Sequence, residues 1–381
     1  MMPRVWSTGH WSQATRGTSI AGVDLETAIR STQDPAKAHW LLARLQRQTA
    51  ERNHVQRLRN RLAAAGSGSP DAEYLNFALF KELDDLGEHA GAWSALEQGG
   101  SCVRRRLVDD GPRREKLFDA IRQRFPLATS ASVNPCQPVP IFIVGMQRSG
   151  TTLLEAMLGA HPEVFAYGES QRLSSALRYA ADHYCQTTVD EFLIAQAASI
   201  DLGLIAEMFL REGRALSGSA RYVTEKLPDN FQLVGFIRHA LPHAKVVHLR
   251  RDAMDLCFAN LRELFGEGVT HSYSIAEVAR FHALYQDLMR HWHDIYPGFI
   301  LDVDYEDLVD NPAATSRRVF EFCGLQWDPR FIDPSQWSER PIATLSAVQA
   351  RGPVSRASVG RWRPYADWLQ PLQDALAQPK R

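Results

Sequence analysis

The sequence contains few cysteines, and none of them is placed for a structural metal site. Its five cysteines stand singly at positions 102, 136, 185, 257 and 323 and form no CxxC pair. This scatter argues against a zinc motif, and the odd number argues against a complete disulfide framework. Unpaired cysteines are typical of a reducing compartment, so we expect a cytoplasmic protein.

Long hydrophobic runs and an excess of one charge are also missing. No segment approaches the ~18 consecutive apolar residues of a membrane-spanning helix, so we expect no membrane span. The first residues contain no continuous apolar stretch and do not resemble a secretory signal. The 381-residue chain has 43 Lys plus Arg against 44 Asp plus Glu. This balance argues against nucleic acid as a partner, although it is compatible with a local basic pocket for an anionic ligand.

The N-terminal part of the chain has helical periodicity. Residues 1 to about 35 show no firm pattern, and we expect them to be loosely ordered. Apolar residues recur at helical spacing over 36–65, and we interpret the arginines of that stretch, from Arg44 to Arg61, as solvated helix surface. Residues 72–106 predict two helices around a Gly turn, a pair that resembles one tetratricopeptide unit. One such unit cannot bury its own apolar face, so we expect it to dock on the C-terminal part.

A different pattern begins after a linker rich in Pro and Ser at 126–140. Short apolar runs now alternate with helical periodicity, which predicts an α/β fold with a parallel sheet. The predicted strands lie at 139–144, 244–249 and 299–303, with helices at 151–158 and 275–292. We therefore divide the chain into an α-helical N-terminal region, 1–135, and an α/β domain of P-loop type, 136–381.

The strongest functional signal lies between the first predicted strand and the helix that follows it. Residues 145–152 read GMQRSGTT, and their glycines allow a tight turn and a close approach to an anion. The lysine of the nucleotide-triphosphatase pattern is replaced by Thr151, which argues against ATP or GTP as donor. Arg148 supplies a planar donor fork instead. The pattern predicts a phosphate cradle for one terminal anion.

The segment IFIVGMQRSGTTLLEAMLGAHP, at 141–162, resembles the 5'-phosphosulfate loop of sulfotransferases that use 3'-phosphoadenosine 5'-phosphosulfate (PAPS). The resemblance covers about 139–370, and it is to the tyrosylprotein sulfotransferases and to bacterial sulfotransferases that carry tetratricopeptide repeats. It implies PAPS as the donor, no required metal, and an acceptor hydroxyl on a small molecule or peptide. The implied donor-loop residues are Arg148, Ser149, Gly150, Thr151 and Thr152.

The same resemblance implies the catalytic groups. Glu169 is expected at the end of a second strand, at the edge where α/β proteins bind ligands. It matches the base of the tyrosylprotein branch, which accepts the proton of the acceptor hydroxyl. His161 is a competing candidate for this role. Lys226, in the segment EKLPDN, matches the lysine that neutralises charge developing on the transferring group. Ser346 is expected near the bridging oxygen, and Arg172 is a candidate to orient Glu169 or an acidic acceptor.

For the second phosphate of the donor, the resemblance implies Arg251 at the end of a strand and Arg361 near the C-terminus, with Tyr305 close to the adenine. The family usually completes this site with a serine eight residues after the arginine, and here that position is Ala259. Two neighbours of this position, Asn260 and Arg262, are candidate substitutes.

Three hypotheses follow for function. The first is a sulfotransferase acting on a peptide tyrosine, a sugar, a lipid or a metabolite. The second is a small-molecule kinase that uses ATP and magnesium, which Thr151 opposes. The third is a non-catalytic helical-repeat protein on a degenerate sulfotransferase scaffold, which Ala259 favours slightly and the presence of Arg148, Glu169 and Lys226 opposes.

Overall fold

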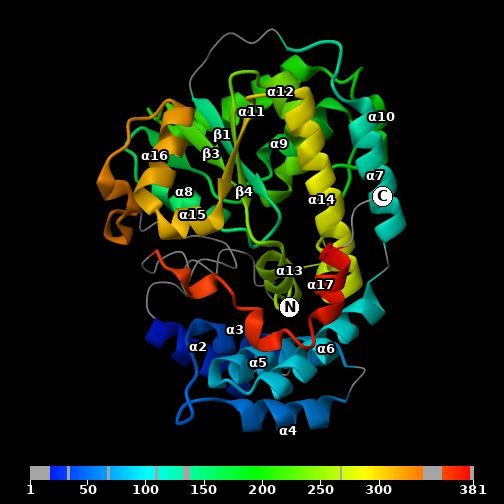
Figure 1. Cartoon of the computed structure of the whole chain (residues 1–381), viewed down its shortest axis with the longest axis vertical. Helices are drawn as coiled ribbons and strands as arrows, with labels where there is room; N and C mark the ends of the chain where they lie inside the picture. The colour runs from blue at the N-terminus through cyan, green and yellow to red at the C-terminus, as the bar shows by residue number, and fades with distance from the viewer. Residues whose placement is uncertain are drawn as a thin grey trace.

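The computed structural model describes residues 18–31, 35–66, 69–107, 110–131, 138–266, 268–337 and 354–377. Within them, a parallel sheet of five strands has helices on both faces (Figure 1). The strand order is β2–β3–β1–β4–β5. The strands are β1 (Val139–Gly145), β2 (Val164–Ala166), β3 (Tyr222–Glu225), β4 (Lys245–Arg250) and β5 (Ile300–Asp304). The predicted α/β fold is confirmed.

The helices of the α/β part form two layers. Helices α8 (Thr151–Gly159), α15 (Tyr305–Asp310) and α16 (Pro312–Cys323) pack on one face of the sheet. The core on the other face includes buried residues of α9 (Arg172–Ala180), α10 (Glu191–Gln196), α11 (Leu202–Ser217), α12 (Val234–Ala240), α13 (Ala253–Leu261), α14 (Ile275–Ile295) and α17 (Gln370–Ala377). Short 3₁₀ turns lie at Pro228–Leu233, Thr270–Tyr273, Pro329–Ile332, Pro334–Gln336, Arg356–Ser358 and Arg363–Tyr365.

The central strand β1 is buried on both faces, which explains its almost entirely apolar sequence. Ile141 and Ile143 pack into the core under α8 and α16. Phe142 and Val144 point to the opposite core, where the Phe142 ring lies 5.4 Å from that of Phe209 on α11. Because side chains alternate along a strand, a continuous apolar run is what a doubly covered strand requires.

The helices of the N-terminal part are α2 (Thr18–Ser31), α3 (Ala36–Leu45), α4 (Val55–Ala65), α5 (Asp71–Leu86), α6 (His89–Arg106) and α7 (Gly111–Arg124). Helices α2 to α6 pack at one end of the α/β part, whereas α7 lies beside α10 and α14 (Figure 1). Gly87 has a φ of 78°, the left-handed conformation that ends α5 and starts the turn into α6. The expectation of loose order does not hold for 18–31, which is helical, and the helical pattern over 36–65 corresponds to two helices, α3 and α4.

The pair α5 and α6 contacts the C-terminal part through aromatic side chains. Phe77 lies edge-on to Tyr273 at 6.3 Å, and Trp93 stacks on Trp368 at 6.1 Å. Tyr365, which is fully buried, lies against both Phe80 and Trp93. The apolar face that one helix pair leaves open is therefore covered by the α/β part.

Two further observations bear on compartment and membrane. Within the described part of the chain, no helix combines the length and the hydropathy needed to cross a bilayer. Four cysteines fall in that part, and all four are free thiols.

Candidate active site

The predicted site residues come from the carboxyl ends of the parallel strands. The phosphate loop follows β1, and Glu169 lies three residues after β2. Lys226, Arg251 and Tyr305 come directly or almost directly after β3, β4 and β5. In open α/β sheets, this edge is where ligands bind, because all carboxyl ends of parallel strands meet there.

The phosphate loop has an unusual backbone conformation. Gly145 and Gly150 have φ values of 156° and 106°, and Arg148 has a φ of 68°, rare for a residue with a side chain. A Cβ atom on Gly145 would lie 2.7 Å from the Leu249 carbonyl oxygen, and one on Gly150 would overlap the Tyr305 ring. Both positions therefore require glycine for steric reasons as well as for conformation.

Arg251 holds the loop from the neighbouring strand. Its Nη1 donates to the Arg148 carbonyl oxygen at 3.0 Å, and its Nη2 donates to the Ser358 carbonyl oxygen. The guanidinium also lies 5.0 Å over the Tyr305 ring and 3.9 Å from Asp255. Asp255 in turn accepts hydrogen bonds from two backbone amides of the C-terminal segment, at Gly360 and Arg361. Arg148, Arg251 and this segment are thus joined in one network.

The loop retains donor groups that fit an anionic ligand. Ser149 is fully buried, and its hydroxyl has no hydrogen-bond partner among the described residues. The Arg251 Nε is also buried without a hydrogen-bond partner among the described residues. Helix α8 begins at Thr151, directly after the loop, so the positive end of its dipole lies at the loop. Buried donors without partners are costly, and phosphate or sulfate oxygens would satisfy them.

Glu169 and Lys226 form an ion pair beside this loop. Lys226 is fully buried, and its Nζ donates to Glu169 Oε1 at 2.6 Å. Glu169 has 38% of its side chain exposed, so the carboxylate is accessible from outside. The Lys226 backbone amide donates to the Gly168 carbonyl oxygen at 3.0 Å, which joins the two segments a second time. The structure therefore brings the predicted base and the predicted lysine together.

Glu155 is a residue of this site that the sequence interpretation missed. It lies on α8, is buried, and uses Oε1 to accept hydrogen bonds from the Gly168 amide at 2.9 Å and from Thr224 Oγ1 at 2.7 Å. Burial raises the pKa of its carboxyl, whereas nearby Lys226 lowers it. Its only signal in the sequence is that it is the one acid within the apolar run TTLLEAML. Helical periodicity alone does not assign a role to such a residue.

Asp229 is a second carboxylate near Glu169 that received no role from the sequence. It accepts a hydrogen bond from Gln147 Nε2 of the phosphate loop at 2.7 Å. Burial, together with the charge of Glu169, raises its pKa to about 6.

Two other candidates from the sequence have structural partners away from Glu169. Arg172 lies 3.3 Å from Glu225 and packs over Tyr167, so it stabilises a buried ion pair rather than orienting Glu169. His161 is buried against the Phe331 ring at 5.2 Å, and its Nδ1 accepts the Glu163 amide. Burial lowers the pKa of His161. The histidine thus has the contacts of a turn-stabilising residue.

Two of the arginines considered for the second phosphate, Arg361 and Arg262, lie at the same carboxylate. Arg361 donates to Asp84 of α5 at 2.6 Å, and Arg262 lies 3.5 Å from the same carboxylate. Burial, with Arg361 nearby, lowers the pKa of Arg262 to about 10. Asn260, a candidate substitute for the missing serine, is fully buried and donates to the Gln147 carbonyl oxygen at 2.8 Å. This hydrogen bond fixes the backbone of the phosphate loop at Gln147.

One arginine of the N-terminal stretch contradicts its interpretation as solvated surface. Arg44 on α3 donates to Glu263 with both Nη atoms, and Glu263 also lies 3.8 Å from Arg148. A second arginine of the stretch, Arg57, is held by Glu26 of α2. Ser346 lies outside the described residues.

The described residues contain one cluster with metal-ligand chemistry: His248, His293 and Asp302. Asp302 Oδ1 bonds to His248 Nδ1 at 2.8 Å and to His293 Nε2 at 2.9 Å, while Oδ2 accepts from Arg250 at 3.1 Å. The adjacent guanidinium disfavours a cation, and the hydrogen bonds account for the arrangement.

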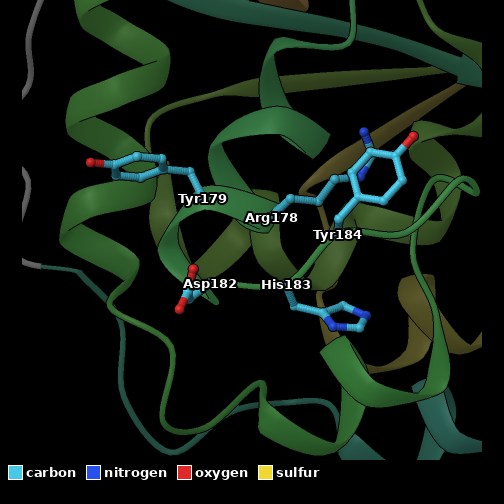
Figure 2. Close-up of a pocket in the computed structure, with 5 residues that line it drawn as sticks. All are labelled: Arg178, Tyr179, Asp182, His183 and Tyr184. Atoms are coloured by element: carbon cyan, nitrogen blue, oxygen red, sulfur yellow. The ribbon is translucent and has the colours of Figure 1, made fainter.

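An open pocket of about 650 Å³ lies at the far end of α9 from Glu169. Figure 2 shows its lining, with the rings of Tyr179 and Tyr184 projecting in different directions. Both tyrosines are mostly exposed, and none of the five lining residues, which are Arg178, Tyr179, Asp182, His183 and Tyr184, belongs to the predicted site.

Comparison with known proteins agrees with this geometry. A model described as the sulfotransferase family matches residues 140–329, which contain the phosphate loop and all of the sheet except Val139, the first residue of β1. This segment of the chain is therefore similar to the sulfotransferase family.

Individual relatives are similar over longer stretches. An uncharacterised protein of Aquifex aeolicus is 32% identical over 323 residues, which are 79% of this chain and 41% of that protein. Protein-tyrosine sulfotransferase 2 of Gallus gallus is 27% identical over 58% of this chain and 62% of its own length. The chain thus spans less than two thirds of either relative. Among solved structures, the sulfotransferase domain of the Synechococcus PCC 7002 olefin synthase aligns with 67% of this chain and 100% of its own, at 17% identity and a TM-score of 0.43.

Proposed function

We propose that the protein transfers a sulfuryl group from PAPS to an acceptor hydroxyl by in-line displacement. The bond from the acceptor oxygen to sulfur forms as the bond from sulfur to the 5'-phosphate oxygen breaks. The acceptor proton passes to Glu169, and 3'-phosphoadenosine 5'-phosphate (PAP) leaves. The match of residues 140–329 to the sulfotransferase family supports this reaction class. The ion pair of Glu169 and Lys226 beside the phosphate loop is the observation that carries the proposal.

The residues at this edge of the sheet have complementary roles in the proposal. Ser149, Gly150, Thr151 and Thr152 bind the phosphosulfate end of the donor with backbone amides and hydroxyls. Arg148 and Lys226 supply positive charge where negative charge develops on the transferring group and on the leaving oxygen. Ser346 is proposed to assist at the leaving oxygen.

At the other end of the donor, Arg251 binds the 3'-phosphate, with Arg361 as a second cation. Tyr305 is proposed to lie near the adenine. The tight packing of its ring on Gly150 and Arg251 agrees with a position beside the donor.

The acceptor is a small molecule or a peptide that carries a hydroxyl group. A protein-tyrosine sulfotransferase is among the relatives, and peptide tyrosine is therefore one acceptor to test. The free thiols of the described residues fit the reducing compartment, the cytoplasm, expected from the sequence. We retain the division into a helical region, 1–135, and a sulfotransferase domain, 136–381, as part of the proposal.

The donor is tested by thermal-shift titration of the purified chain with PAP and, separately, with ATP and magnesium. Binding to the folded state raises the melting temperature with ligand concentration. We expect PAP to stabilise the protein and ATP to do so much less. Stabilisation by ATP and magnesium alone would favour the kinase hypothesis.

The role of Glu169 is tested by the variant Glu169→Gln in a sulfate-transfer assay over an acceptor panel, with mass detection of the added group. We expect a loss of at least about 100-fold in kcat, with PAP binding retained. Glu163→Gln is the matched control, because this residue is nearby, partly exposed and paired with Arg221. Full activity of Glu169→Gln would assign the base to another residue.

A further inference from the structure

The turn that carries Glu169 begins with a glycine in a left-handed conformation. Gly168 has a φ of 72°, and a Cβ atom on it would meet nothing within 4 Å. Glycine is therefore needed here for its conformation rather than for space, and it also gives the backbone its widest range of alternative conformations. Contacts from outside the turn then decide where Glu169 is held.

Both polar groups of the Gly168 backbone have such contacts. The Gly168 amide donates to Glu155 Oε1 at 2.9 Å, and its carbonyl oxygen accepts the Lys226 amide at 3.0 Å. Glu155 belongs to α8, the helix that follows the phosphate loop, and Lys226 comes directly after β3. The first half of the turn is thus held between α8 and the end of β3.

Glu155 is built into the core as a fixed acceptor. The residue is only 6% exposed, and Thr224 Oγ1 of β3 donates at 2.7 Å to the same Oε1 that accepts the Gly168 amide. A buried carboxylate is costly unless its oxygens accept hydrogen bonds. Here a single oxygen joins α8, β3 and the turn.

The second half of the turn is anchored separately. Glu225 of β3, which is 1% exposed, accepts Ser170 Oγ at 2.9 Å and the Leu173 amide at 3.4 Å. Glu169 lies between the two anchors, and 38% of its side chain is exposed, so packing alone does not fix it. Loss of the Glu155 contact would therefore release the first half of the turn while Glu225 still holds the second.

We propose that Glu155 is a positioning residue for the base: by holding the Gly168 amide, it fixes the backbone that aims Glu169 at the acceptor oxygen. The proposal rests on the proposed sulfotransferase function. A general base works only within hydrogen-bond reach of the proton that it accepts, and a displacement of about 1 Å can cost about 100-fold in rate. Because Glu155 acts through the turn rather than on the donor, its loss affects kcat much more than donor binding.

The test compares Glu155→Leu with Glu155→Gln in the full-length protein. Both variants lack the charge, but only glutamine keeps a carbonyl oxygen that can accept the two hydrogen bonds of Oε1. In the sulfate-transfer assay, with the acceptor that the panel identifies, we expect kcat of Glu155→Leu to be about 30-fold below that of Glu155→Gln. The PAP affinities of the two variants, measured by calorimetric titration, should agree within about 3-fold. Equal kcat values, or a donor affinity that falls as far as kcat does, would overturn the proposal.

Glu82 supplies the matched control, because it is also a buried carboxylate that binds the backbone of another segment. It belongs to α5, 1% of its side chain is exposed, and it accepts the His54 amide at 2.5 Å and contacts His54 Nδ1 at 2.8 Å. We expect Glu82→Leu to lower the melting temperature, as Glu155→Leu does, while kcat stays within about 3-fold of the unaltered protein. A fall in kcat as large as that of Glu155→Leu would attribute the effect to lost stability and overturn the proposal.

A stability cycle tests the same contact without any acceptor. Glu169→Gln removes the ion-pair partner of buried Lys226, so it should lower the urea midpoint of unfolding. This shift should be less than about half as large in the Glu155→Leu background as in the Glu155→Gln background, because a displaced Glu169 pairs poorly with Lys226. Equal shifts in the two backgrounds would contradict a positioning role, since both backgrounds lack the charge of Glu155.

These measurements separate the positioning role from the proposed function. If the unaltered protein neither binds PAP nor transfers sulfate, the proposed function fails, and the stability cycle still decides whether Glu155 holds Glu169. If Glu155→Leu does not fold by circular dichroism, Glu155→Asp takes its place, because the shorter side chain draws the acceptor oxygen back from Gly168. Glu155→Asp must then have a lower kcat than Glu155→Gln, and equal values would overturn the proposal.

Discussion

At the scale of single residues, the candidate site is a set of acids and bases whose charges are balanced pairwise. Lys226 pairs with Glu169, and Arg172 pairs with Glu225, both at the end of β3. Burial raises the pKa of Glu225, and the adjacent Arg172 opposes that rise. Such pairing lowers the free-energy cost of burying these charges in a site that must accept a highly charged donor. Asp229 is different, since its bond to Gln147 is to a neutral amide.

Asp229 therefore predicts a pH-dependent stability. Its folded-state pKa is raised to about 6 from an ordinary value of 3.8. A carboxyl with a raised pKa contributes its full stability below about pH 4, and this contribution is lost as the pH rises through about 6. The variant Asp229→Asn, which stays neutral, should match the unaltered protein in melting temperature at pH 4 and exceed it above pH 6.

The melting temperatures of both proteins are measured between pH 4 and 7.5. Asp119→Asn is the control for loss of one negative charge, because Asp119 is exposed on α7 and lies against Arg122. A difference between Asp229→Asn and the unaltered protein that is constant with pH would show that burial does not govern this carboxyl.

At the scale of elements, the sequence predicted the sheet better than the contacts that assemble the site. The three predicted strands agree with β1, β4 and β5 to within a residue or two, because a doubly buried strand leaves a continuous apolar run. The second strand expected before Glu169 is β2, whereas β3, with four residues, is too short to give a pattern. The helix at Thr18–Ser31 was missed, because its apolar positions show little periodicity.

Ion pairs and hydrogen bonds between residues far apart in the chain could not be predicted from the sequence. The residues Glu169 and Lys226 came from resemblance to a family, but their 2.6 Å contact could not be derived from spacing. Arg44 was interpreted as solvated because only Glu51 stands nearby in the sequence, and its partner, Glu263, is brought to it by the fold. The helix pair α5 and α6 was predicted from its Gly turn, whereas the pairing of Asp84 with Arg361 was not.

The phosphate loop gives a prediction at this scale, because its glycines are required for two separable reasons. Gly150→Ala should abolish PAP binding, since the new methyl group would overlap the Tyr305 ring and the φ of 106° is strained for alanine. Gly298→Ala is the matched control: Gly298 also has a positive φ, 76°, but has open space around its Cβ position. Calorimetric titration with PAP should show normal binding for Gly298→Ala, with a modest loss of stability of about 1 kcal/mol. Near-normal binding by Gly150→Ala would show that the Tyr305 ring can move aside without loss of the site.

At the scale of the whole molecule, the helical region and one face of the sheet share a hydrophobic core. The cluster of buried residues that contains Phe142 and Val144 of β1 continues through Tyr365 to Phe80 and Trp93 of the N-terminal helices. Helix α7 contributes to the same core. The centre of its Phe118 ring lies 5.9 Å from that of Phe231 and 6.1 Å from that of Phe281. Two parts of a chain that share buried surface of this kind are expected to unfold together.

The final prediction is a single cooperative unfolding transition, tested with Trp93→Ala. Trp93 is buried between Tyr365 and Trp368, so its truncation should cost about 3–5 kcal/mol and lower the melting temperature of the whole chain. Scanning calorimetry should show one transition that PAP raises in both proteins. Phe192→Ala is the control, since Phe192 is 49% exposed on α10, and its truncation should shift the transition much less. An early transition in Trp93→Ala that melts part of the helix content while PAP still raises the later one would show that the two parts fold independently, and that the contacts of Arg44 and Asp84 with the donor site are optional.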